Sequence, residues 1–369
     1  MQNRFFIFVV FVFLSRTLYA SEQNSFYEKG IWYLNKSEYT AAQYYLEFAR
    51  AAPSISNETA KKIDEHLTQI RHLKKWDIEF GIGAIPDSNI NYSPSNRHEC
   101  INTSDGTFCT ELPDPVSGIG LQINGAANLY TALYKNIGLR TTIGGAILNI
   151  SDNIPTDYSA HFAVGPRYIF SHGDISIQPS FGIRMYNSTF YNLSYGVRLS
   201  SNLQIGKTFT DSGIDIQRNY YHNHNINEAL RGFDWTFYIH PKYYINELSF
   251  ISFTTAISHN HTELTALGSD TGRIAIGYFY SFPYGFNFYI NAMYSFSSYH
   301  TPDEQINTST LTSARRDNIY QFYTRIYNKN ISLYNFIPAL GYTYTIQDSN
   351  ISRYDQTNHQ IMIEIIRLF

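Results

Sequence analysis

The feature that most constrains the fold is a regular alternation of apolar and polar residues, repeated from residue 76 to the end of the chain. Residues 174–186 show it clearly, because Ile175 and Ile177 alternate with Ser176 and Gln178. Side chains change face at every residue of a strand, so a period of two gives each strand one apolar and one polar face. Strands of ten or more residues with this pattern fit a wall between lipid and water, whereas soluble sandwiches usually have shorter strands. The pattern predicts an all-β transmembrane barrel.

The composition agrees with a membrane barrel. Aromatic residues make up 17% of the chain and charged residues 15%, and there are 32 tyrosines. Tyr, Trp and Phe suit the two interfacial girdles of a barrel, where a ring lies half in lipid with its polar edge in water. The net charge of -3 argues against nucleic acid as a partner.

Residues 1–20 are expected to be a signal peptide. Arg4 precedes an apolar run over residues 5–14, and Tyr19-Ala20 forms a plausible cleavage point. No later stretch reaches the roughly 18–20 apolar residues that a membrane-spanning helix needs. Strands must then cross the bilayer, and the expected location is the cell outer membrane.

The two cysteines, Cys100 and Cys109, lie nine positions apart in a polar stretch rich in Asn, Ser, Thr and Gly. In an exported protein this arrangement predicts a loop disulfide, rather than two free thiols or a metal pair.

Residues 21–75 differ in character and predict a small α-helical periplasmic domain. Its aromatic, small and aliphatic residues are spaced for paired helices and resemble a tetratricopeptide repeat: Phe26, Gly30, Tyr33, Tyr39, Ala42, Leu46 and Ala49. Residues 57–75 predict a further helix, with apolar residues every three or four positions. One repeat cannot bury its own face well, so a capping helix or the mouth of the barrel must complete it. Two interpretations remain open: a helical plug or spacer, and a peptide-holding module facing the periplasm.

The barrel, residues 76–369, is predicted to have about fourteen strands. They are expected at 76–91, 118–134, 138–150, 158–171, 174–187, 192–207, 211–220, 232–245, 248–258, 271–282, 286–299, 316–328, 333–347 and 358–369. Short connections alternate with longer ones, as in single-chain bacterial barrels with an even number of strands. Both barrel ends and the helical domain should then face the periplasm. Four prolines fall inside these strands, and each should mark a bulge or a weakened pairing: Pro166, Pro179, Pro241 and Pro338.

The segment that leaves the first strand, and the end of the chain, resemble a known family. The first-strand motif consists of Pro86, Asp87, Ser88, Asn89, Ile90 and Asn91, and it follows the strand that begins at Trp76. With residues 353–356 and the closing strand ending at Phe369, it is similar to the barrel domain of the surface lipoprotein assembly modifiers. The resemblance covers essentially the whole chain after the signal peptide.

This resemblance implies an outer-membrane translocon that delivers client proteins, surface lipoproteins or related secreted proteins, to the cell surface. It also implies periplasmic chaperones and the outer-membrane barrel insertion machinery as partners, the latter reading Phe369 as a C-terminal insertion signal. No enzymatic activity and no cofactor are expected. The seam between the first and last strands is the candidate lateral opening, because the two ends of the barrel form it. The alternative is a porin or dedicated solute channel, although such a pore has no use for the helical domain.

Three residue groups could indicate other chemistry. His222, His224, His259 and His261 fall in two loops that could meet in a zinc or haem site, although surface loops collect such residues without any ligand. Ser258 and His259 could supply a nucleophile and base, but neighbours on a strand point to opposite faces. Asp87, Asn89 and Asn91 could bind Ca²⁺, or could instead line the lumen or pin the first strand to its neighbour.

Overall fold

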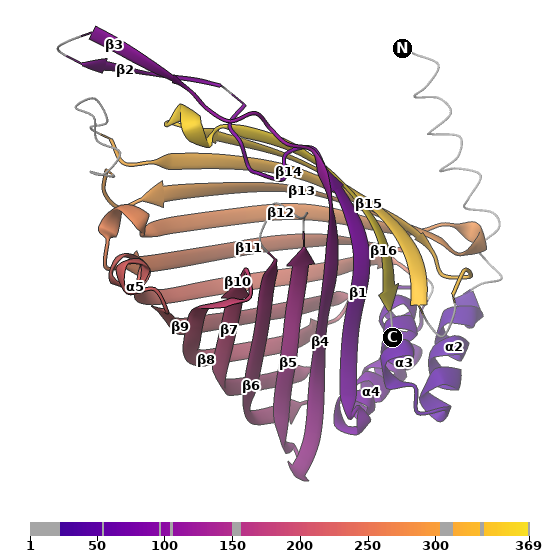
Figure 1. Ribbon diagram of the computed structural model, residues 1–369. Helices are drawn as coiled ribbons and strands as arrows, with labels where there is room; N and C mark the ends of the chain where they lie inside the picture. The colour runs from indigo at the N-terminus through magenta and orange to yellow at the C-terminus, as the bar shows by residue number, and fades with distance from the viewer. Residues whose placement is uncertain are drawn as a thin grey trace, which may run out of the picture.

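The computed structural model describes residues 23–53, 55–95, 97–103, 106–149, 156–302, 313–332 and 336–367. The expected signal peptide at residues 1–20 and the terminal Phe369 lie outside these ranges. Within them, a closed antiparallel barrel follows a small helical domain (Figure 1).

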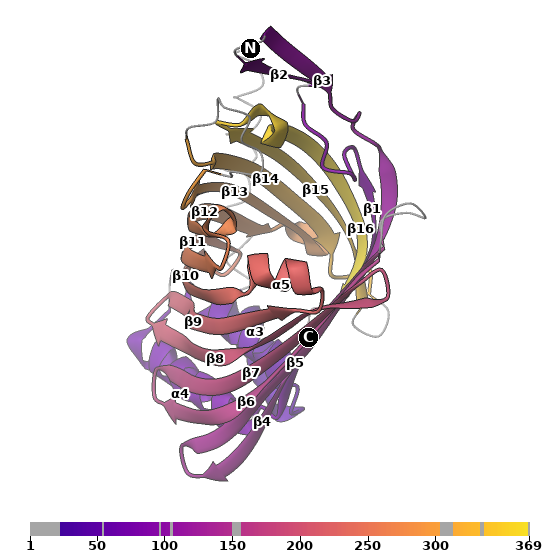
Figure 2. The same ribbon diagram turned by 60° about the vertical axis from the view of Figure 1, so that its left-hand side comes forward.

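The barrel has fourteen strands, as the alternating pattern predicted. They are β1 (Trp76–Asp87), β4 (Gly118–Tyr134), β5 (Ile137–Asn149), β6 (Asp157–Phe170), β7 (Gly173–Tyr186), β8 (Thr189–Ile205), β9 (Thr208–Tyr221), β10 (Gly232–Asn246), β11 (Ser249–Thr262), β12 (Ser269–Ser281), β13 (Phe286–Tyr299), β14 (Arg316–Asn328), β15 (Phe336–Ser349) and β16 (Gln356–Arg367). Each pairs with its neighbours in sequence order, and β1 closes the barrel against β16. Figure 2 shows β1 and β16 side by side on the closing wall.

The two faces of the wall separate as expected. On β7, Ile177 is 49% exposed on the outer surface, while its neighbour Gln178 is fully buried on the inner one. The same division places Phe253 outside on β11 and Ser252 inside. A belt of exposed aliphatic and aromatic side chains on the outside and a polar interior are what a barrel in a bilayer requires.

The connections define two ends of the barrel. One end, the short-turn end, carries the links after β4, β6, β8, β10 and β12, each of two to four residues. The longer link after β14 lies at the same end, where the N–H of Lys329 donates to the carbonyl oxygen of Gly285 in the β12–β13 link. The opposite, long-loop end carries the connections after β1, β5, β7, β9, β11, β13 and β15, including residues 88–117 and 222–231. One prediction was wrong here, because β7 and β8 are joined by a two-residue turn, Asn187-Ser188, rather than a longer loop. Both turn residues have positive φ, 51° and 60°, which matches a tight hairpin turn and lets the strands extend further.

Several short elements at the long-loop end were not predicted. The hairpin of β2 (His98–Thr103) and β3 (Gly106–Glu111) lies in the connection from β1 to β4 and projects beyond the barrel (Figure 1). Helix α5 (His224–Leu230) lies between β9 and β10. Its N-cap, Asn223, accepts hydrogen bonds from the N–H groups of Asn225 and Ile226, which fixes the start of the helix.

The four strand prolines weaken pairing without shifting the register. Pro166 and Pro179 share one interruption of the β6–β7 ladder, and Pro241 lies at an interruption between β10 and β11. Pro338 lies just beyond the last described pair of β14 with β15. A proline has no N–H to donate, so one ladder loses a bond while the ladder on the other side stays paired.

The helical domain consists of α2 (Gln23–Asn35), α3 (Tyr39–Arg50) and α4 (Asn57–Leu73). Ser56 caps α4 by accepting the N–H of Thr59 at 3.1 Å, which satisfies one free donor of the first turn. Among the described residues, no helix combines the length and apolar character that crossing a bilayer requires. Because α4 leads directly into the start of β1, the helices lie at the short-turn end (Figure 1).

Candidate functional site

The positions that resemble a tetratricopeptide repeat form the interface of α2 with α3. Ala42 and Leu46 are fully buried, and Phe26 and Ala49 are nearly so. A Cβ on Gly30 would lie 2.7 Å from the Leu46 side chain, so the close crossing of the two helices needs glycine there. The rings of Tyr33 and Tyr45 stack at 5.3 Å, and Tyr39 packs against the same core.

The helical core continues into the barrel lumen. Phe48 of α3 is 1% exposed and lies between aromatic rings on the inner face of the wall, at 4.8 Å from Tyr244 and 5.8 Å from Phe279 between ring centroids. Phe250 completes this group at 6.1 Å. These three barrel residues form an aromatic collar inside the short-turn end. The helices therefore pack against the inner wall of the barrel and share one hydrophobic core with it.

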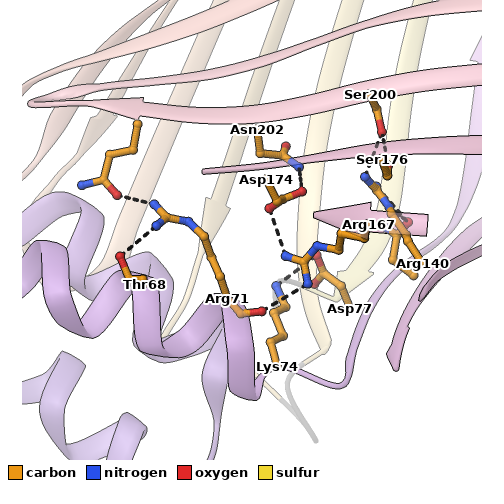
Figure 3. A network of polar contacts seen from close by, with 12 residues as sticks. Thr68, Arg71, Lys74, Asp77, Arg140, Arg167, Asp174, Ser176, Ser200 and Asn202 are labelled. Carbon is orange, nitrogen blue, oxygen red and sulfur yellow. Dashed lines mark hydrogen bonds and ion pairs between the residues drawn. The ribbon is translucent and has the colours of Figure 1, made fainter. Parts of the chain in front are cut away.

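A polar network fixes α4 to the rim of the same end (Figure 3). Thr68 and Arg71 both donate to the carbonyl oxygen of Ser171, in the turn between β6 and β7, at 2.9 and 3.2 Å. Gln204 of β8 accepts from the Arg71 guanidinium and donates to Asp64 of α4. One face of α4 is thus bonded to two neighbouring hairpins of the barrel.

A buried ion pair extends this network into the wall. Arg167 of β6 bonds the Asp174 carboxylate at 2.9 Å, with both side chains less than 10% exposed. The same guanidinium donates to the main-chain carbonyl of Arg71 at 3.1 Å. In Figure 3 Arg167 points from the wall toward the end of α4. A buried cation needs several acceptors to offset its lost hydration, and the end of α4 supplies one of them.

Glu47 is a further carboxylic acid at this junction. Glu47 of α3 accepts hydrogen bonds from Gln43 at 2.8 Å and from the Tyr244 hydroxyl at 3.0 Å. Burial raises the pKa of Glu47 above its ordinary value, against the opposing effects of these donors and of Lys242. Beside it lies a cavity of about 370 Å³ between α3 and the inner wall of the barrel, lined by Lys242, Tyr289 and Arg325 among others. The docked helices therefore leave part of the lumen unfilled.

Docking on the mouth of the barrel was one of two expected ways to complete the repeat, but the contacts themselves were not predicted. They join residues about 100 positions apart or more, such as Arg71 and Gln204. A signal was present within α4, because Asp64, Thr68 and Arg71 follow a helical spacing and form a polar stripe. Such a stripe can indicate a second surface, although a solvated helix face has the same pattern.

The first-strand motif lies at the seam, the pairing of β1 with β16. Asp87, 8% exposed, accepts the N–H of Asn89 at 2.8 Å and the side-chain amides of Asn358 and Gln360 at 3.3 and 2.6 Å. Ser88 donates to Asn358 at 3.1 Å and accepts the N–H of His359 at 2.9 Å. Asp87 and Ser88 therefore fasten the long-loop end of β1 to the last strand of the barrel.

The rest of the motif is not strand. β1 ends at Asp87 rather than at Asn91, and the chain turns at Tyr92, whose φ is 51°. Asn89 bonds the main chain of Ser93 at 2.8 Å in both directions, and Asn91 donates to the carbonyl oxygen of Asp114. Ile90 is 4% exposed and packs on Gly118, where a Cβ would lie 2.6 Å from its terminal carbon. Asp87, Asn89 and Asn91 thus form a hydrogen-bonded turn rather than one ligand face.

The seam is the least paired ladder among the described residues. β1 and β16 share six register pairs, whereas every other ladder of the barrel has eleven to fourteen. Ile85 and Pro86 have no partner on β16, although both pair with β4. Pro86 cannot donate to a ladder, so the motif itself contributes to the interruption of the seam.

The remaining predicted residues lie away from both places. Cys109 is disulfide-bonded, and the hairpin register places it opposite Cys100. Ser258 bonds Thr236, while His259 bonds Asp270, so these two neighbours do not bond each other. His222 packs on Phe190 and His224 pairs with Glu228. The possible site of four histidines is therefore not formed: His261 stacks on His259 at 6.5 Å between ring centroids, and His259 gathers with Asp270 and His300.

The comparisons with solved structures find outer-membrane proteins of low sequence identity. A loop L8 deletion mutant of OmpT, an outer-membrane protein of Vibrio cholerae, is 11% identical, with a TM-score of 0.42 over 79% of this chain and 98% of that one. The outer-membrane protein OprD of Pseudomonas aeruginosa is 7% identical, with a TM-score of 0.38 over 79% and 94%. No curated protein matches the chain.

The family comparison covers the whole barrel. The family described as surface lipoprotein assembly modifier matches residues 76–369, the span that begins with β1 and contains every strand of the closed barrel. This match agrees with the resemblance of the first-strand motif and of the closing strand. The chain therefore belongs to the surface lipoprotein assembly modifier family, as a fourteen-stranded outer-membrane β-barrel.

Proposed function

We propose that this protein is a translocon that delivers client proteins, surface lipoproteins or related secreted proteins, across the outer membrane to the cell surface. Membership of the surface lipoprotein assembly modifier family supports this role. The observation that carries it furthest is the docked helical domain, because Phe48 and Glu47 place α3 at one mouth of the lumen. A client approaching that mouth meets the helices first.

In this proposal the short-turn end and the helices face the periplasm, following a cleaved signal peptide at residues 1–20. Single-chain bacterial barrels keep short turns on the periplasmic side and long loops outside. The disulfide-bearing hairpin of β2 and β3 then lies at the cell surface. Client proteins reach the helices with periplasmic chaperones, and the barrel insertion machinery recognises Phe369 when the protein itself is assembled.

The inner surface suits passage of a polypeptide. On β8 the inward side chains include Ser200, 7% exposed, and Arg198, which pairs with Asp215 at 2.7 Å. A polar cavity of about 310 Å³ adjoins this pair. Polar groups that are already paired with one another bind an extended chain weakly, so a client can move along this surface without binding tightly.

The seam is the proposed lateral exit for a client with a lipid anchor. An acyl chain cannot remain in a watery lumen without a large hydrophobic cost, so it must reach the bilayer through the wall. The seam is the ladder with the fewest described pairs, and its interruption at Ile85 and Pro86 is built into the sequence. Opening six pairs is a smaller change than opening the eleven or more of any other ladder.

The proposal is tested on intact cells. Surface lipoproteins and secreted proteins are probed with protease in cells with and without this gene, and total client is measured by immunoblotting. We expect at least one client that is made in normal amount but becomes shielded from protease when the gene is deleted. Unchanged surface display of every candidate would contradict the proposal and favour the solute channel.

A further inference from the structure

Two histidines and one carboxylate meet at the long-loop end of the barrel. His259 on β11 is the register partner of Asp270 on β12, and His300 directly follows β13. Nδ1 of His259 lies 2.6 Å from one Asp270 oxygen, and Nε2 of His300 lies 3.4 Å from the other. One ligand atom from each residue lies within 4.8 Å of the other two. Three neighbouring strands therefore bring their side chains to one point.

The cluster lies on the outer surface of the wall, just beyond the apolar belt. Ile257, two residues before His259 on the same face, is 53% exposed, and Ile274 on β12 is 50% exposed. Asp270 has a side-chain exposure of 63%. An ion from the medium can therefore reach the carboxylate without crossing the lumen.

Both imidazole rings are held in place by their surroundings. The His259 ring stacks on Trp235 of β10, with 6.1 Å between centroids. The main-chain N–H of His300 donates to the carbonyl oxygen of Gly268 at 3.1 Å, and a Cβ on Gly268 would lie 2.7 Å from Nδ1 of the His300 ring. The glycine leaves room for the ring to lie in this position. Such supporting contacts are what orient histidine ligands in metal sites.

One ligand atom lacks a hydrogen-bonding partner. Nε2 of His300 is buried and makes no hydrogen bond, even though an Asp270 oxygen lies 3.4 Å away. A buried nitrogen whose polar contact is too poor to count as a hydrogen bond costs free energy that a bound group would recover. The direction in which it faces, toward Asp270 and the His259 ring, is the direction from which a shared cation would bind.

We propose that His259, Asp270 and His300 bind a divalent transition-metal ion, with Zn²⁺ as the best match. Imidazole nitrogen and carboxylate oxygen are ordinary zinc donors, with bonds of about 2.0–2.2 Å. A tetrahedral site with such bonds separates its ligand atoms by about 3.3 Å. The three ligand atoms already lie within 4.8 Å of one another. Binding requires only small side-chain shifts, because the two imidazole nitrogens now contact different oxygens of Asp270, at 2.6 and 3.4 Å. The fourth position faces the medium and takes water or a donor from another molecule.

The bound ion would join the ends of β11, β12 and β13. The connection between β11 and β12 contains a short helix, η1 (Thr265–Leu267), and Thr265 bonds Thr301 at 3.0 Å. An ion bound by His259, Asp270 and His300 would hold the two ends of that connection together and attach them to the end of β13. The site would therefore stiffen this part of the surface rim, independently of any client.

The test uses the full-length protein, purified in detergent without a polyhistidine tag and washed with a chelator. Zn²⁺ is titrated by calorimetry into the unmodified protein and into three variants: His259→Asn, His300→Asn and, as the control, His224→Asn. His224 is a surface imidazole paired with Glu228, so its removal takes away one histidine without touching the cluster. Heat-modifiable migration on gels verifies that each barrel is folded.

We expect the unmodified protein and the His224→Asn control to bind one Zn²⁺ per chain in a saturable manner. Each variant of the cluster should lower the affinity by at least about tenfold, since loss of a ligand exceeds loss of a supporting contact. If the cluster variants do not fold, Asp270→Asn serves in their place. Absence of saturable binding by the unmodified protein, or equal binding by cluster and control variants, would show that the three residues form only a surface ion pair.

Discussion

At the scale of single residues, Phe279 tests whether the barrel wall holds the helices in place. It is 5% exposed and supports Phe48 from the lumen side. Truncating a buried Phe lowers the free energy of unfolding by about 3–5 kcal/mol. Because Phe279 contacts Phe48, part of this loss weakens the packing of α3 against the wall. Phe279→Ala should speed hydrogen exchange of α3 amides while leaving the folding of the helices themselves intact. Phe253→Ala, on the outer face and 45% exposed, is the control, and equal exchange in both variants would contradict a docked domain.

We expect Glu47 to make that docking depend on pH. Because burial raises its pKa, the docked state binds a proton more readily than the undocked one, and docking weakens as pH rises through the raised pKa. Below the ordinary value of about 4.5 both states are protonated, and docking is strongest there. Exchange of α3 amides should therefore accelerate from acidic to neutral pH.

Glu47→Gln isolates this effect, because it keeps the shape of the side chain and removes its charge. The variant should show little change over the same pH range, whereas Glu58→Gln, on the exposed face of α4 and paired with Lys62, should follow the unmodified protein. A pH response that persists in Glu47→Gln would show that Glu47 is not the group that controls docking.

At the scale of elements, the seam can be locked by a disulfide. Ala84 and Ile363 are register partners across β1 and β16, and opposed residues of an antiparallel pair are close enough for a disulfide. Cysteines at both positions should stop surface delivery of a lipid-anchored client under oxidising conditions, and reduction should restore it. A matched pair at Ile123 and Ile147, across β4 and β5, should have no effect. Full delivery through the locked seam would exclude it as the exit.

The strands were predictable because apolar and polar residues alternate along each of them. Alternation at Ile175 to Gln178 marks both the element and its lipid-facing side, and the length of β7 matched the expectation to within one residue at each end. The β2–β3 hairpin was not predicted, because residues 98–111 are mostly polar and lack alternation. Only the two cysteines indicated that this stretch is folded, and the register places them opposite each other.

The places where elements meet were not predictable in the same way. Asp87 depends on Asn358 and Gln360, which lie more than 270 positions later. The cluster at Asp270 needs the register of β11, β12 and β13 to bring His259 and His300 together. The first set of contacts follows from the closure of the barrel and the second from the register of consecutive strands, and no local pattern in the sequence specifies either.

At the scale of the whole molecule, the architecture combines a barrel with a domain that shares its core at one mouth. Phe48 and the aromatic collar are joined there, while the cavity beside Glu47 keeps part of the lumen unfilled. A solute channel would need that mouth open at rest. In a translocon, the same domain can bind a client and then be displaced from the mouth by it. Docking of the helices is therefore expected to be reversible.

The most direct test is reconstitution of the purified protein in liposomes, with its helical domain on the side to which an unfolded client lipoprotein and its chaperone are added. We expect the client to become exposed to protease on the opposite side only when the barrel is present, with Phe253→Ala as active as the unmodified protein. A barrel that conducts ions but leaves every client on the side of addition would show that the protein is a channel rather than a translocon.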